Sequence, residues 1–208
     1  MRTFPDLRIR ETVWESQRAG RLLDDRDWAA ARDAFTAIRA RVAKLGVESS
    51  YVIWGLAVAL DNLGEIDMAF EAVSEAVQKD PMNPACHHSF DVIAGRLRAA
   101  LCDAARTPDD PSTPRLYALL QRAGEADVPS HLAMARHHAH AGKHEQAMRL
   151  LDAVTLLSPV SRDAWLQKAA LARALGAEVL AASCDAEAAV IAGSDVPFGV
   201  PSPRGAVC

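Results

Sequence analysis

The stretch YVIWGLAVALDNLGEIDMAFEAVSEAVQKDPMNP, residues 51–84, decides the fold of this chain. Its first half places Ile53, Leu56 and Leu60 on one side, at the spacing of a helix that buries an apolar stripe. Its second half repeats this pattern. Gly64 separates the halves, as expected for a glycine that follows the end of a helix. The stretch therefore predicts two amphipathic helices joined by a turn.

The same landmarks recur along the chain at fixed offsets. A shift of 78 residues maps Ala57 and Gly64 onto Ala135 and Gly142. A further shift of 34 gives a third copy, and a backward shift of 38 gives a fourth. Because 78 exceeds twice 34 by ten, a degenerate copy with about ten extra residues is expected between them. The repeats are expected near 12–49, 50–83, 84–127, 128–161 and 162–192.

This unit resembles the tetratricopeptide repeat (TPR), a helix-turn-helix unit of 34 residues. The resemblance implies an all-α fold, a right-handed α-solenoid of about ten helices whose first helices line a concave groove. Residues 1–9 are expected to be a lead-in, residues 10–192 the repeat domain, and residues 193–208 a disordered tail rich in Pro and Gly. Helices are expected near 10–24, 27–44, 50–63, 66–79, 84–105, 114–123, 129–141, 144–157, 161–174 and 177–192.

Composition argues against several classes of partner. The chain has 23 Lys and Arg against 27 Asp and Glu, so it has no general basic field for nucleic acid. It contains no apolar run of about 18 residues, and charges interrupt its first residues where a signal peptide would be apolar. The four cysteines are scattered without a CxxC pair, which favours reduced thiols. We expect a cytoplasmic protein without membrane or nucleic-acid partners.

The resemblance also implies which residues would face the groove, since these lie one position round the helix from the packing residues. In the best repeat they are Tyr51, Trp54, Val58 and Asp61. Trp54 is a large aromatic where packing does not require one, and such residues often anchor a bound segment. The equivalent positions are Val13, Ser16, Gly20 and Leu23 in the first repeat and His88, Val92, Leu132, Arg136, His140, Leu166, Ala170 and Arg173 in the later ones.

These positions suggest a protein-interaction scaffold or adaptor that binds a segment of a partner protein. One subgroup of the family binds acidic C-terminal tails through a clamp of Lys, Asn and Arg, and the matching positions here are mainly apolar or small. An apolar segment is therefore the expected ligand. The small cytoplasmic TPR chaperones of secreted or assembling proteins are an alternative. Self-association through the weakly capped last repeat is a further possibility.

Motifs for chemistry are scarce. The chain has no phosphate-binding glycine loop or nucleophile elbow, so no enzymatic activity and no cofactor are expected. Five of the seven histidines fall within residues 131–144, where His140 and His144 could form a two-histidine metal site. A metal-binding protein or an enzyme using this turn is the alternative from another class. Gly142 interrupts the helix between the two histidines, and His131 and His138 fall on the packing face, which favours a structural role without metal.

Overall fold

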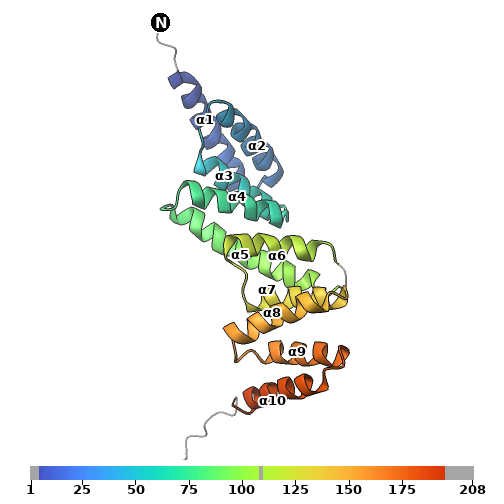
Figure 1. Cartoon of the computed structure of the whole chain (residues 1–208). Helices are drawn as coiled ribbons and strands as arrows, with labels where there is room; N and C mark the ends of the chain where they lie inside the picture. Colours follow the sequence, from blue (N-terminus) through green and yellow to red (C-terminus); the bar gives the residue numbers. More distant parts are fainter. Residues whose placement is uncertain (1–4, 108–109, 195–208) are drawn as a thin grey trace, which may run out of the picture. The chain divides into compact units, whose positions relative to one another are not determined.

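Regular structure in the part of the chain that the structure describes is entirely helical. The computed structural model describes residues 5–107 and 110–194, and these form ten α-helices without a β-strand. The all-α, TPR-like helical-repeat class predicted from the sequence is confirmed (Figure 1). The disordered tail was expected over residues 193–208, of which residues 193 and 194 belong to the last helix and residues 195–208 lie outside the described residues. The helices are α1 (Pro5–Asp24), α2 (Trp28–Lys44), α3 (Ser50–Asn62), α4 (Ile66–Lys79), α5 (Pro84–Ala104), α6 (Ser112–Ala123), α7 (Val128–His140), α8 (His144–Leu157), α9 (Arg162–Ala174) and α10 (Glu178–Ser194).

Local signals fix most of the helix ends. The Asp27 carboxylate accepts from the Ala30 amide ahead of α2, and Asp127 accepts from the Ser130 amide ahead of α7. Each carboxylate satisfies an amide that has no partner in the first helical turn. Gly64 follows α3 with a φ of +80°, which a residue with a Cβ rarely adopts. Such capping groups are visible in the sequence, which explains the agreement of the expected and observed bounds.

Two helices differ from the expectation. α1 begins at Pro5, five residues before the expected start, so residues 5–9 belong to the helix and not to a lead-in. Proline supplies a fixed φ that suits a first helical turn, and it can begin a helix as readily as precede one. α5 has 21 residues against 13 in α3, so part of the expected insertion lengthens this helix.

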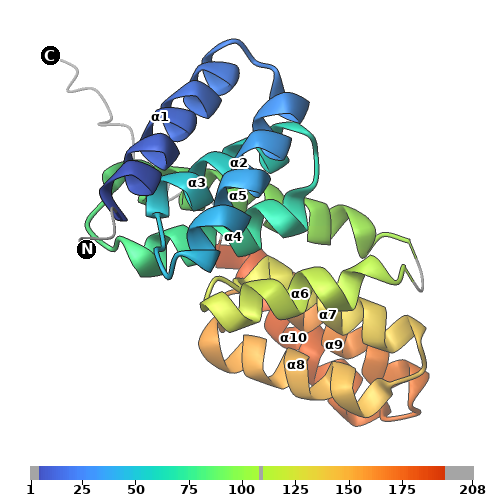
Figure 2. The ribbon, with the colours of Figure 1, turned by 90° about the horizontal axis from the view of Figure 1, so that it is seen from above.

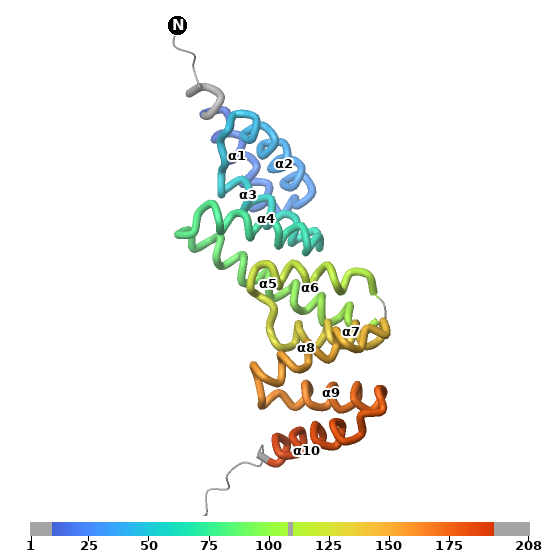
Figure 3. The backbone as a smooth tube through the Cα atoms, viewed as in Figure 1, coloured from blue at the N-terminus to red at the C-terminus, as the bar shows by residue number. Residues whose placement is uncertain are grey.

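The tertiary contacts divide the chain into two compact units. Unit 1 comprises Met1–Ala104 and Pro111–Ala126, and unit 2 comprises Ala105–Asp110 and Asp127–Cys208. Unit 1 therefore contains α1 to α6, and unit 2 contains α7 to α10. Within each unit the backbone follows successive helical hairpins (Figure 3). The single repeat domain expected over residues 10–192 stays a prediction.

Unit 1 is organised around α3, which contacts α1, α2, α4 and α5. The side-by-side packing of α1 with α2 is visible in Figure 2. Phe35 of α2 is fully buried, and its ring occupies the space where a side chain at Gly55 of α3 would lie. Phe70 of α4 is also buried, with its ring centroid 5.5 Å from that of Phe90 on α5. Aromatic rings thus fill the contact between α2 and α3 and the contact between α4 and α5.

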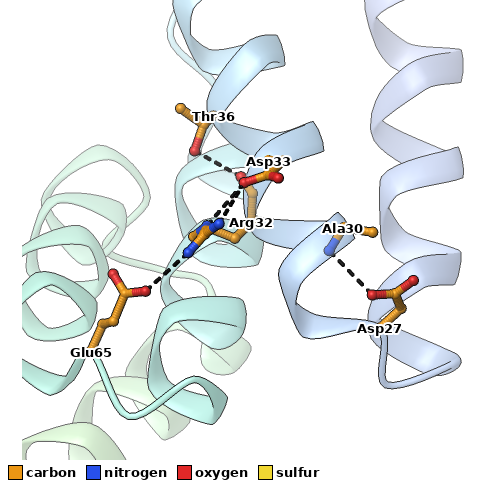
Figure 4. Close-up of polar contacts among 6 residues, drawn as sticks. All are labelled: Asp27, Ala30, Arg32, Asp33, Thr36 and Glu65. Carbon is orange, nitrogen blue, oxygen red and sulfur yellow. Dashed lines mark hydrogen bonds and ion pairs between the residues drawn. The ribbon is translucent and has the colours of Figure 1, made fainter.

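Ion pairs link α2 to α4 and to Glu65, the residue before α4. The Arg32 guanidinium lies 2.9 Å from Asp33 and 3.1 Å from Glu65 (Figure 4). Arg39 pairs with Glu75 at 2.5 Å. These side chains are each about one third exposed or more, so solvent screens the pairs and they contribute little to stability. Apolar burial in the core therefore dominates the packing of unit 1.

Unit 2 has its own apolar core between α7, α8 and α9. The core cluster consists of Leu132, Ala135, Ala147, Leu151, Val154, Ala164 and Leu171. Alanine is frequent because the helices approach closely where side chains are small. No helix in residues 5–107 and 110–194 is long and apolar enough to cross a membrane.

Candidate functional site

The predicted groove residues of α3 lie along one side of the helix in unit 1. Tyr51 is 42% exposed, and Trp54 and Val58 are half-buried. The rings of Tyr51 and Trp54 lie 5.7 Å apart, and Tyr51 meets Phe35 edge-on at 6.2 Å. Burial, assisted by the charge of Asp24, raises the pKa of the Tyr51 phenol, which keeps it neutral. This part of α3 therefore presents a neutral aromatic surface.

Two polar contacts join this side of α3 to α5. The Trp54 indole Nε1 donates to the Ser89 hydroxyl at 2.9 Å, and Arg96 pairs with Asp61 at 2.5 Å. Both contacts join residues 35 apart in sequence, so the two helices lie side by side in a constant register. Ser89 and Arg96 could have been found from the sequence, because each lies one repeat length plus one residue after its partner on α3. Trp54 thus supports the contact between α3 and α5, and its role as an anchor for a partner stays a prediction.

The α5 positions predicted for the groove are open to solvent. His88 is exposed, and Val92 is 40% exposed. They flank Ser89, the residue that contacts Trp54. The structure therefore brings the predicted α3 and α5 residues to neighbouring positions in unit 1.

An apolar cavity of about 580 Å³ lies between α1, α2 and α3. Its apolar wall consists of Val13, Val42, Leu45, Val47 and Tyr51. Its polar wall includes Ser16, whose hydroxyl donates to the Thr12 carbonyl at 2.7 Å, and Glu48, which pairs with Lys79. The cavity therefore has little free charge.

Sequence reasoning missed most of this cavity. Leu45 and Val47 flank Gly46 in the link between α2 and α3, and a periodic pattern does not include residues in a link. The available signal for the cavity in the sequence was the pair of apolar residues, Leu45 and Val47, on either side of Gly46. The Ser16 side chain, predicted for the groove, is instead 6% exposed and bonded within α1.

Gly20 of α1 allows Tyr51 to reach this position. A Cβ at Gly20 would lie 2.4 Å from the Tyr51 hydroxyl oxygen, so a larger residue would displace the ring. Val13 and Trp14 on α1 are 53% and 70% exposed. The first helix thus exposes large apolar side chains, one of which lines the cavity.

The predicted groove residues of unit 2 divide into buried, paired and cavity-lining positions. Leu132 is 6% exposed and belongs to the core, so its assignment to a groove is corrected. Packing against α8 and α9 covers it, because the buried stripe of α7 is wider than the predicted one. Arg173 pairs with Asp185 of α10, and Leu166 is 39% exposed.

Arg136 and His140 line a second cavity, of about 270 Å³, within unit 2. His144 at the start of α8 and Gln167 of α9 supply its remaining polar groups. The other lining residues are Ala135, Ala139, Leu151, Ala170, Leu171 and Ala174. Sequence reasoning assigned Arg136 and His140 to an open groove, whereas the structure places them with an imidazole and an amide from two further helices.

The histidine cluster is spread over different environments. Burial lowers the pKa of His131, partly offset by Asp127, and burial lowers that of His138, reinforced by His137 and Lys143. His140 and His144 reach the same cavity. Among the residues that the structure describes, no group of three or more His, Cys, Asp or Glu side chains could hold a metal ion.

Two of the described cysteines, Cys86 and Cys184, are free thiols. Cys86 and Cys184 are buried, and burial raises the pKa of each thiol. A raised pKa lowers the fraction of reactive thiolate. These side chains therefore serve packing, as buried cysteines often do.

Comparison with known proteins gives a distant likeness. No protein-family model matches the chain, and no curated protein matches it. Among solved structures, a crystal structure of MamA is 12% identical, with a TM-score of 0.46, and the match covers 95% of this chain and 98% of that chain. MamA 41-end from Desulfovibrio magneticus RS-1 is 11% identical, with a TM-score of 0.40 and coverage of 89% and 97%. Similarity of this size identifies neither a partner nor an activity.

Proposed function

We propose that this chain is a non-enzymatic, cytoplasmic protein-interaction scaffold of the TPR kind, and that unit 1 binds an apolar segment of a partner protein. The observation that carries the proposal is the open apolar cavity of about 580 Å³ between α1, α2 and α3. The partner segment would insert an apolar side chain there and lie along the exposed side chains of α3 and α5.

The composition of the cavity supports an apolar ligand. Val13 and Val47 are 53% and 36% exposed at its wall, although burying an aliphatic side chain is favourable by about 1.5–3 kcal/mol. Its charged lining residue, Glu48, is already paired with Lys79. A charged ligand would gain little there, whereas an aliphatic or aromatic side chain would remove apolar surface from water.

The proposal is tested by substituting a residue of the cavity wall and asking whether a specific partner protein is no longer bound. Affinity-tagged wild type, Val13→Asp and Val179→Asp would be used to capture proteins from the native cytoplasm, with identification by mass spectrometry. Val179 is a matched control, because it is a valine 88% exposed on α10 in unit 2. We expect a partner that binds wild type and Val179→Asp and is lost with Val13→Asp.

A binding measurement with the purified partner completes the test. Val13→Asp removes apolar contact with the inserted side chain. It is expected to weaken partner binding by about tenfold or more, which corresponds to about 1.4 kcal/mol of binding free energy. Thermal melts check that Val13→Asp remains folded. Equal binding of the partner by Val13→Asp and wild type would refute the use of this cavity.

A further inference from the structure

The cavity of unit 2 contains polar groups without a protein partner. The Nε atom of Arg136 is buried and, within the described part of the chain, has no hydrogen-bond partner. The same holds for Nδ1 of His144. Both residues line the cavity of about 270 Å³ between α7, α8 and α9. Buried polar groups in proteins are nearly always hydrogen-bonded, so two such atoms in residues that line one cavity require an explanation.

Both acidic residues of α8, and Asp185 of α10, are engaged elsewhere. Glu145 pairs with Arg149 at 2.8 Å, and Asp152 pairs with Lys168 at 2.8 Å. Asp185 pairs with Arg173. α7 itself contains no carboxylate. Among the described residues, no carboxylate forms an ion pair with the Arg136 guanidinium.

The charge and the walls of the cavity define the ligand. One guanidinium matches one negative charge, and its planar donors suit a carboxylate. The start of α8 at His144 adds the positive end of a helix dipole. Alanine and leucine side chains form the remaining wall, which suits a hydrocarbon stem. A volume of about 270 Å³ equals roughly nine water molecules, enough for a carboxylate on a short aliphatic chain.

We propose that this cavity is a binding site for a carboxylate on a short aliphatic stem, with Arg136 as its anionic anchor. His140, His144 and Gln167 supply further hydrogen bonds, and the apolar wall holds the stem. The site lies within unit 2 and is independent of the apolar cavity of unit 1. Its ligand is either a free aliphatic carboxylate or an acidic side chain of a protein segment.

Calorimetric titration of the full chain at pH 7.5 tests the site, with sodium hexanoate as the probe and hexanamide as its neutral counterpart. Hexanoate is expected to bind with a Kd in the roughly millimolar range, and hexanamide at least about tenfold more weakly, because a hydrogen bond to a charged group is the main difference. Equal binding of the two probes would overturn the proposal.

Three arginine variants separate the site from the overall charge of unit 2. Arg136→Gln is expected to weaken hexanoate binding at least about tenfold. Arg162→Gln removes the same charge from the exposed start of α9, outside the cavity, and should bind as wild type does. Arg136→Lys keeps the charge without the fork and should fall between wild type and Arg136→Gln. Wild-type affinity in a folded Arg136→Gln, or no hexanoate binding by wild type, would overturn the proposal.

A peptide arm distinguishes the two sources of the carboxylate. Acetyl-Ala-Leu-Glu-Leu-Ala-amide and its Gln counterpart would be titrated in the same way. Binding of the Glu peptide more tightly than hexanoate, with loss in the Gln peptide and in Arg136→Gln, assigns the site to a protein segment. Binding of hexanoate alone assigns it to a free carboxylate. Both outcomes support the carboxylate site.

Discussion

Gly55→Ala is expected to destabilise the protein, although the same change usually stabilises a helix. Alanine is favoured over glycine in a helix interior by about 0.5–1 kcal/mol. At Gly55, however, the new Cβ would lie 2.4 Å, 2.6 Å and 2.7 Å from three atoms of the Phe35 ring. Carbon atoms in contact normally lie about 3.5–4.0 Å apart, so the ring must move by about 1 Å or more.

The ring has little room to move, because Phe35 is fully buried and packs against Tyr51. Overpacking of a core typically costs about 1–3 kcal/mol. After the helix-propensity gain is subtracted, we expect a net loss of about 1–2 kcal/mol in the free energy of unfolding. The melting temperature should fall by roughly 2–8 °C.

Urea and thermal unfolding followed by circular dichroism measure this loss. Gly95→Ala on α5 is the control, since its Cβ would meet no atom within 4 Å, and it should stabilise by about 0.5–1 kcal/mol. Phe35→Leu in a double-mutant cycle should recover about 1 kcal/mol of the Gly55→Ala loss. A Gly55→Ala protein as stable as Gly95→Ala would refute the close contact between α2 and α3.

Three further predictions concern other parts of the two units. Gly20→Ala should change stability by less than about 0.5 kcal/mol, because its clash involves the end of the Tyr51 side chain, which is 42% exposed and can move; a loss above about 2 kcal/mol in urea unfolding would contradict this. Leu132→Ala should cost about 2–5 kcal/mol as a core truncation, whereas Leu166→Ala should be nearly neutral in the same assay; equal effects would place Leu132 on the surface. Burial lowers the pKa of His138, so the fold favours its neutral form, and its stability contribution is complete above the unfolded-state pKa of about 6.5 and declines as pH falls below that value. His138→Gln should therefore lose less stability than wild type between about pH 7.5 and 5.5 in urea unfolding, and an unchanged pH dependence would contradict the prediction.

The sequence by itself determined the helices and their order. Periodic apolar residues defined each helix, and capping groups such as Asp27, Ser49 and Gly64 defined the ends. These signals act within a few residues of chain, so no knowledge of the neighbouring helices is needed. The start of α1 was missed because its Pro5 permits either a lead-in or a first turn.

Only the tertiary structure decided which side chains are covered and which groups meet. The periodicity of a helix shows on which face a side chain lies, but the packing of the neighbouring helix decides whether that face is buried. Packing thus covered Leu132, tied Trp54 to Ser89 and placed Phe35 over Gly55. The same packing brought Arg136 of α7 to one cavity with His144 of α8. The sequence named Arg136, but its unpartnered Nε depends on the surroundings that the neighbouring helices create.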